Sequence, residues 1–257
     1  MKIVPSTKLR AFYEFLASLS LSTNTQKCIM NDLIRKDNHI KLVKLFNESF
    51  NHIESIYDNT NEPFLNPNAK RKPIIYKTTF ESTNEVMSHF QNNKELFVSP
   101  PMYNFEYIER EISPLRTTNA KFYNGKSAKS SGTGGLDFIG WNTSKKLPVL
   151  GEIKVKNDQN PFYAIIQLLT YLSEISTQNQ IDRINKFKLF GTDNSISSDT
   201  KFYLYIISCH KSNSIPKHNQ LLPNAKDLAK KIVMEINKIE DILFFNLDPD
   251  TKVITQE

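Results

Sequence analysis

The chain has 257 residues and a formal net charge of +6, from 33 lysines and arginines against 27 aspartates and glutamates. Its 39% hydrophobic and 23% charged residues are typical of a globular protein that buries a core, and they exclude disorder as its general state. The modest basic excess favours an anionic partner but does not establish one.

The two cysteines, Cys28 and Cys209, are far apart in the sequence, so neither a disulfide framework nor a thiolate metal site is expected. This composition fits the reducing cytoplasm. The longest apolar run, 202–209, is far shorter than the roughly 20 residues that a membrane helix needs. Charged residues near the N-terminus also argue against a targeting peptide, and we expect no membrane partner. The sequence leaves the oligomeric state open.

Residues 1–60 are predicted to form a helical N-terminal extension, because apolar residues recur there at helical spacing. These are Phe12, Phe15, Leu16 and Leu19, and then Ile40, Val43, Leu45, Phe46, Phe50 and Ile53. Residues 61–78 are rich in proline and asparagine and predict a linker. A second domain is expected over 79–257.

The second domain is predicted to alternate between helices and strands. Three strands in succession favour a meander, and the nearly apolar 202–209 favours a central strand. The expected elements are a helix at 79–94, strands at 107–112, 136–141 and 147–155 with a turn at 142–146, a helix at 161–175, a strand at 202–209 and a closing helix at 225–242.

Two neighbouring strands carry acidic residues that we expect to converge. Side chains two apart on a strand share a face, so Glu152 and Lys154 point to one side and Ile153 to the core. If the strands pair across their short turn, Asp137 lies within reach of Glu152. Two carboxylates held together repel, and a hard divalent cation with oxygen ligands relieves that repulsion.

A Glu-x-Lys triplet also arises by composition alone, so a surface ion pair at the end of a strand is the plain alternative. Two other acidic triplets, Asp199-Thr200-Lys201 and Asp250-Thr251-Lys252, serve as internal comparisons. The first precedes its strand and the second lies in a turn with proline. Only Glu152-Ile153-Lys154 ends an apolar strand.

This order of elements resembles the PD-(D/E)xK nuclease superfamily, with an aspartate, Asp137, at the end of one strand and Glu152-Ile153-Lys154 at the end of the next. The resemblance covers roughly 79–209 and implies an α/β restriction-endonuclease-like core, a central mixed β-sheet flanked by helices. It implies that Asp137 and Glu152 bind Mg²⁺, or Mn²⁺ in its place, with the backbone carbonyl of Ile153. Lys154 would orient or activate the attacking water. Leu136 stands where the motif's name has a proline.

The helix at 161–175 adds Gln167 and Tyr171, a Gln-x-x-x-Tyr spacing on one helix face beside Tyr163 and Glu174. The spacing resembles the subgroup of this superfamily found in recombination exonucleases. It implies a role for Gln167 at the catalytic site and for Tyr171 in nucleic-acid binding. The alternative is an ordinary amphipathic helix.

The resemblance also implies a further metal ligand from the helix ahead of the first strand, here 79–94. Glu81, Glu85 and His89 are spaced four apart there and share one face. Glu85 and His89 are the candidates, although such a row also fits a solvated face. Glu109 and Glu111 on the following strand are the alternatives.

Five lysines are candidates for phosphate contacts on the rim of the site, as opposed to a solvated loop. They are Lys121, Lys126, Lys129, Lys145 and Lys146.

Together these features predict a Mg²⁺-dependent nuclease, a hydrolase of phosphodiester bonds, with DNA favoured over RNA. The rival hypothesis is a catalytically silent nucleic-acid-binding or protein-interaction module on the same fold.

Overall fold

A mixed eight-stranded sheet forms the centre of the protein, in a computed structural model that describes residues 3–4, 7–18, 23–56, 60–61, 64, 80–112, 114–115, 121–122, 136–156, 160–211 and 220–257. A separate parallel pair joins β1 (Ile3–Val4) to β5 (Lys121–Phe122). In spatial order the strands of the main sheet are β2 (Glu95–Leu96), β4 (Phe105–Ile112), β6 (Leu136–Asn142), β7 (Leu147–Val155), β8 (Phe202–Cys209), β9 (Ile239–Leu247), β10 (Ile254–Gln256) and β3 (Val98–Ser99).

The sheet is nearly closed into a barrel. Its two edge strands, β2 and β3, are separated in the chain by Phe97 alone. One pairs with β4 and the other with β10, at opposite edges. One linking residue can span this gap only if the sheet curls until its edges approach each other.

The strands predicted from the sequence are confirmed at the centre of this sheet. β4, β6 and β7 pair antiparallel in succession, as expected for a meander. β8 lies between β7 and β9 and is parallel to both. Its near-continuous apolar sequence follows from burial on both faces.

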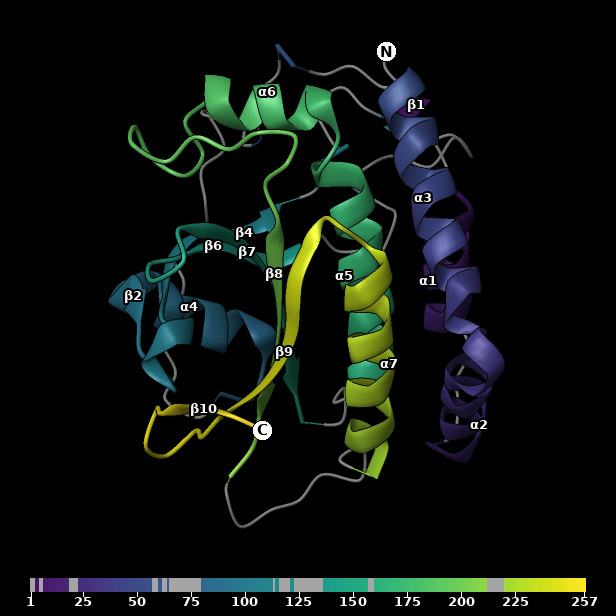
Figure 1. Ribbon diagram of the computed structural model, residues 1–257. Helices are drawn as coiled ribbons and strands as arrows, with labels where there is room; N and C mark the ends of the chain where they lie inside the picture. Colours follow the sequence, from purple (N-terminus) through teal and green to yellow (C-terminus); the bar gives the residue numbers. More distant parts are fainter. Residues whose placement is uncertain are drawn as a thin grey trace.

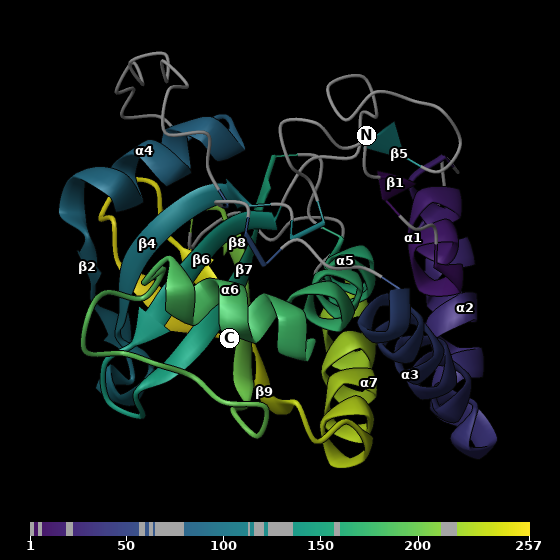
Figure 2. The same ribbon diagram turned by 90° about the horizontal axis from the view of Figure 1, so that it is seen from above.

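The helices form layers on the two sides of the sheet (Figure 1). α5 and α7 cover one side and α1, α2 and α3 pack outside them, while α4 lies on the other side, an arrangement that Figure 2 also shows from above. None of the helices in the described ranges is long and apolar enough to cross a membrane. The seven α-helices in those ranges are α1 (Lys8–Ser18), α2 (Thr23–Ile34), α3 (His39–Ile56), α4 (Thr83–Asn93), α5 (Pro161–Ile175), α6 (Gln178–Lys186) and α7 (Leu222–Glu235).

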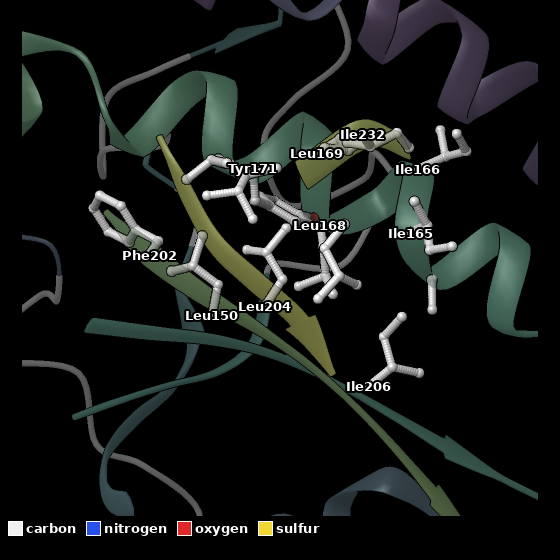
Figure 3. Packing of buried hydrophobic residues seen from close by; sticks show 14 of the residues in the cluster. Leu150, Ile165, Ile166, Leu168, Leu169, Tyr171, Phe202, Leu204, Ile206 and Ile232 are labelled. Atoms are coloured by element: carbon white, nitrogen blue, oxygen red, sulfur yellow. The ribbon is translucent and has the colours of Figure 1, made fainter. Parts of the chain in front are cut away.

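One hydrophobic core fills the space between the sheet and the layered helices. Figure 3 shows Leu204 and Ile206 of β8 with Leu168 of α5 in this cluster. Leu9 of α1 and Phe46 of α3 belong to the same cluster. The predicted helical extension therefore shares its core with the sheet, whereas the predicted linker at 61–78 lies almost entirely outside the described residues.

A second core lies inside the curl of the sheet and is rich in aromatic rings. Phe90 of α4 packs edge-on against Phe105 and Phe138, whose rings stack on each other. Tyr205 and Phe245 extend this cluster across β8 and β9. The two faces of β7 therefore both meet buried cores.

The closing helix predicted at 225–242 is wrong in its last part. α7 ends at Glu235, the backbone becomes extended at Ile236, and the chain continues as β9 from Ile239. The apolar residues of β9 pair with β8 across almost the whole length of that strand, and this pairing outweighs helix propensity. No helix was predicted at α6, and no strands were predicted at β2, β3 or β10.

Close packing between β6 and β7 requires a glycine. A Cβ atom at Gly151 would lie 2.0 Å from the ring of Phe138, which is fully buried. This glycine directly precedes Glu152, so the fit of Phe138 also sets the backbone path into the predicted site.

We expect Gly151→Ala to destabilise the protein by about 1–3 kcal/mol, because the ring of Phe138 must move within a packed core. Urea denaturation measures the change. Adding Phe138→Leu should relieve part of it, so the double variant should lose less than the sum of the two single losses. Phe46→Leu, in the other core, is the control and should add independently. Additivity with Phe138→Leu would contradict this account of Gly151.

Candidate active site

The candidate site lies where β6 and β7 stop pairing. The ladder runs from Asn142 opposite Leu147 to Phe138 opposite Gly151. In the same register, Asp137 and Glu152 are the next residues facing each other, and directly opposed residues share a face of the sheet. The predicted approach of the two carboxylates is confirmed.

Beyond the last backbone pair, the side chain of Asp137 accepts a hydrogen bond from the opposite strand, as a backbone carbonyl does within the ladder. Its Oδ2 accepts a hydrogen bond of 2.8 Å from the N–H of Ile153. The side chain thus bridges the two strands one step beyond their last backbone pair, which fixes its orientation. Asp137 is half-buried.

Glu152 is almost completely enclosed, with 1% of its surface exposed. Burial raises the pKa of Glu152 well above its ordinary value. The negative charge of Asp137 and a side-chain hydrogen bond between Asp137 and Glu152 raise this pKa further, whereas the positive charge of Lys154 lowers it. One carboxylate oxygen, Oε1, is buried without a hydrogen-bond partner among the described residues. A buried carboxylate oxygen in this condition is unfavourable unless a proton or cation reaches it.

Lys154 lies on the same face and is 3% exposed. Its Nζ is 3.6 Å from Oε2 of Glu152 and donates a hydrogen bond of 3.3 Å to Oε1 of Gln167. The ammonium also lies over the ring of Tyr163, 5.2 Å from its centroid. The alternation predicted for Glu152 and Lys154 is confirmed, but their face is as buried as that of Ile153.

Gln167 and Tyr171 occupy different surroundings on α5. Oε1 of Gln167 accepts the hydrogen bond from Lys154, so Gln167 lies beside the expected metal site, and its catalytic role stays a prediction. Tyr171 is 1% exposed, and the guanidinium of Arg10 lies 5.7 Å from its ring centroid. The structure corrects the expected role of Tyr171, since a side chain in the core is not a nucleic-acid contact.

The donors present fit a hard divalent ion. Asp137 and Glu152 offer carboxylate oxygens, Ile153 lies between Glu152 and Lys154, and the orphaned Oε1 of Glu152 needs a positive partner. Within the described part of the chain, however, no group of three or more His, Cys, Asp or Glu side chains is placed to hold a metal ion.

Glu85 and His89 are not brought to Asp137 and Glu152. α4 packs into the core inside the curl of the sheet, on the face of Ile153, whereas Lys154 faces α5. Oε2 of Glu85 accepts a hydrogen bond of 2.5 Å from the N–H of Glu81.

His89 lines a pocket at the edge of the sheet together with Lys252. Burial, and then the charge of Lys252, lower the pKa of His89. Its ring packs beside that of Phe80, with centroids 5.2 Å apart. These contacts give His89 a place in the structure away from the paired carboxylates.

Glu109 and Glu111, the alternative ligands on β4, lie closer to Asp137 along the paired strands. Arg110 pairs with Phe138 and Ile112 with Leu136, so the backbone of Glu111 stands opposite Asp137. The side chain of Glu111 lies outside the described part of the structure. Oε1 of Glu109 accepts a hydrogen bond from the N–H of Arg110.

Two of the candidate phosphate-binding lysines, Lys145 and Lys146, are placed by the described residues, and both lie away from the paired carboxylates. Lys145 and Lys146 lie in the β6–β7 turn, at the opposite end of the hairpin from Asp137. Five residues of β7 separate that turn from Glu152, roughly 16 Å at strand spacing. The side chain of Lys121 and all of Lys126 and Lys129 lie outside the described residues.

Sequence reasoning missed the part of the site that α1 contributes. Tyr13 stacks on the half-buried Tyr163, and the buried Arg10 forms an ion pair with the buried Glu174. Tyr163 and Glu174 carried a local signal, since they share a helix face with Gln167. Arg10 and Tyr13 carried no such signal, because a contact between segments far apart in the chain produces no periodic pattern in the sequence.

Comparisons of the chain with protein-family models, with curated proteins and with solved structures find no match. The functional proposal therefore depends on the geometry of the site.

The raised pKa of Glu152 predicts how the metal-free protein responds to pH. Because the folded state holds this proton more tightly than the unfolded chain, its stability should fall as pH rises from the ordinary glutamate range through the folded pKa. Glu152→Gln should remove this part of the dependence. Thermal unfolding in EDTA between about pH 5 and 9 measures it.

Glu95→Gln, at the exposed residue of β2, is the control and should keep the wild-type pH dependence. Adding Mn²⁺ should stabilise the wild type at high pH but not Glu152→Gln. An unchanged pH dependence in Glu152→Gln would contradict the assignment of the proton to this carboxylate.

Proposed function

We propose that the protein is a metal-dependent nuclease of the PD-(D/E)xK type, with a restriction-endonuclease-like core. It would hydrolyse the phosphodiester bonds of nucleic acid, with DNA favoured over RNA. The observation that carries the proposal is the convergence of Asp137, Glu152 and Lys154 where β6 and β7 separate, with Oε1 of Glu152 buried and unpartnered.

The ion-binding part of this proposal rests on two carboxylates and one carbonyl. Asp137 and Glu152, with the carbonyl of Ile153, would hold Mg²⁺ or Mn²⁺. When bound, such an ion offsets the negative charge of the phosphodiester and of its transition state. Asp137 is half-buried while Glu152 is enclosed, so the substrate would approach from the Asp137 side.

Lys154 would act on the reacting groups with a fixed ammonium. Its contacts with Glu152 and Gln167 restrict a side chain that is otherwise flexible. From this position Nζ can orient the attacking water or stabilise the charge that develops on the phosphate oxygens. Gln167 holds the ammonium through Oε1 and so belongs to the same unit.

A catalytically silent binding module is the rival proposal, and the burial of Glu152 and Lys154 is the observation that favours it. A structural ion pair also lies buried in many proteins. Such a pair, however, needs no second carboxylate, and Asp137 adds a charge that raises the pKa of Glu152. It also does not explain the unpartnered Oε1.

Substitutions in the site should remove cleavage without unfolding the protein. We expect Asp137→Asn, Glu152→Gln and Lys154→Met each to lower Mg²⁺-dependent cleavage by at least about 100-fold, since each removes a group acting in the transition state. Cleavage of labelled DNA and RNA with Mg²⁺, Mn²⁺ or EDTA measures this.

The chain offers a matched control in the triplet Asp199-Thr200-Lys201, in which Asp199 and Lys201 are exposed. Asp199→Asn and Lys201→Met make the same chemical changes outside the site and should leave cleavage unchanged. Full activity in Glu152→Gln, or activity that persists in EDTA, would overturn the nuclease proposal. A lysine variant that loses only affinity would make Lys154 a phosphate contact.

The Gln-x-x-x-Tyr spacing leads to a prediction about substrate form. We expect linear or single-stranded DNA to be cut faster than covalently closed duplex. Gln167→Ala should lower the rate more than Tyr171→Phe, because Gln167 contacts Lys154 while Tyr171 lies in the core. Rapid cleavage of closed circular duplex at one sequence would instead indicate an enzyme of the restriction type.

A further inference from the structure

The N-terminal helix α1 reaches the candidate site through two tyrosines. The rings of Tyr13 on α1 and Tyr163 on α5 stack, with centroids 5.2 Å apart and planes 19° from parallel. Burial raises the pKa of Tyr13, and the neighbouring Tyr171, a hydrogen bond with Tyr163 and the charge of Glu152 raise it further. Tyr13 thus places α1 against Tyr163, the residue of α5 whose ring contacts Lys154.

Tyr163 forms one wall around the ammonium of Lys154. The ring lies 5.2 Å from Nζ, while Gln167 and Glu152 hold the same nitrogen by hydrogen bond and charge. A cation over an aromatic face is attracted to it, more strongly where water is excluded. Contacts from both α5 and β7 thus restrict the position of this nitrogen.

The position of Tyr163 is itself secured. Its backbone N–H donates to Oδ1 of Asn160, which caps the start of α5. One helical turn after Tyr171, Glu174 accepts two hydrogen bonds from the guanidinium of Arg10, and both side chains are buried. This buried ion pair fixes how α1 lies along α5, because a shift of one helix along the other would leave a buried charge without its partner.

We propose that Tyr163, stacked on Tyr13 of α1, is a positioning residue that holds the ammonium of Lys154 in place for phosphodiester hydrolysis. This inference rests on the proposed nuclease function. It gives α1 a supporting role at the active site, through the stacking of Tyr13 on Tyr163.

Position matters here because a lysine side chain is long and has many rotamers. Holding Nζ in one place removes that freedom before the substrate arrives. Loss of the ring should affect the chemical step and leave substrate binding little changed, since the ring contacts the ammonium that acts on the reacting groups.

The test compares four variants of the full-length protein. Tyr163→Leu removes the ring, Tyr163→Phe keeps it, and Tyr13→Leu removes only the stacking partner. Phe46→Leu is the control, because Phe46 is a buried ring that stacks on Phe50 in the same helical layer without contact to Lys154. Tyr13→Leu tests the same link if Tyr163→Leu does not fold.

Two measurements are made on each variant. The first is the split between kcat and KM for Mg²⁺-dependent cleavage. The second is the rate at which acetic acid N-hydroxysuccinimide ester acylates Lys154, read by mass spectrometry against the exposed Lys145 as an internal reference. Acylation needs no nuclease activity, so it separates this inference from the proposed function.

For Tyr163→Leu we expect kcat to fall by about 10- to 100-fold with KM within about twofold, together with acylation of Lys154 that is faster by about tenfold. Tyr13→Leu should show smaller changes in the same direction. Tyr163→Phe and Phe46→Leu should resemble the wild type in both measurements.

Unchanged acylation of Lys154 in Tyr163→Leu would overturn the proposal, as would a kcat no lower than that of Phe46→Leu. A fall in kcat equal in Tyr163→Phe and Tyr163→Leu would also overturn it, since the ring would then not be the cause. An inactive wild type would overturn the nuclease function instead, and acylation would still show whether Tyr163 holds Lys154.

Discussion

The loss of backbone pairing beyond Phe138 and Gly151 is the constraint from which the candidate site follows. Where the strands separate, the N–H of Ile153 bonds to the carboxylate of Asp137 instead of a strand carbonyl. That bond holds Asp137 on the face of Glu152, so two carboxylates meet in an enclosed place. Lys154 offsets negative charge at Glu152. A proton on Glu152, whose pKa is raised, or a bound cation relieves the repulsion between the two carboxylates.

The position of α5 turns this pair of carboxylates into a polar network. An amphipathic surface helix would turn Gln167 and its neighbours toward water, but α5 lies between the sheet and α1, so its polar face is buried as well. Polar groups in such a place need partners. Gln167 bonds to Lys154 and Glu174 to Arg10, and the network therefore extends from β7 through α5 to the N-terminal helices.

Local features of the site could be predicted from the sequence, and features that depend on packing could not. Strand alternation and a short turn were enough to bring Asp137 to Glu152. Helical spacing also put Glu85 and His89 on one face of a helix, yet nothing in that spacing tells which face of the sheet the helix covers. The Arg10–Glu174 pair joins residues 164 positions apart, a separation at which no pattern in the sequence connects them.

The two carboxylates differ in what they do for the fold, and this difference decides what their substitution reports. Asp137 bridges two strands through Oδ2, so removal of its side chain takes away a structural hydrogen bond as well as a charge. Oε1 of Glu152 has no such bond in the part of the chain described by the structure. A buried side chain of similar shape without the charge should relieve repulsion there and leave the strands in place. Glu152 is therefore the position at which chemistry and folding are most cleanly separated.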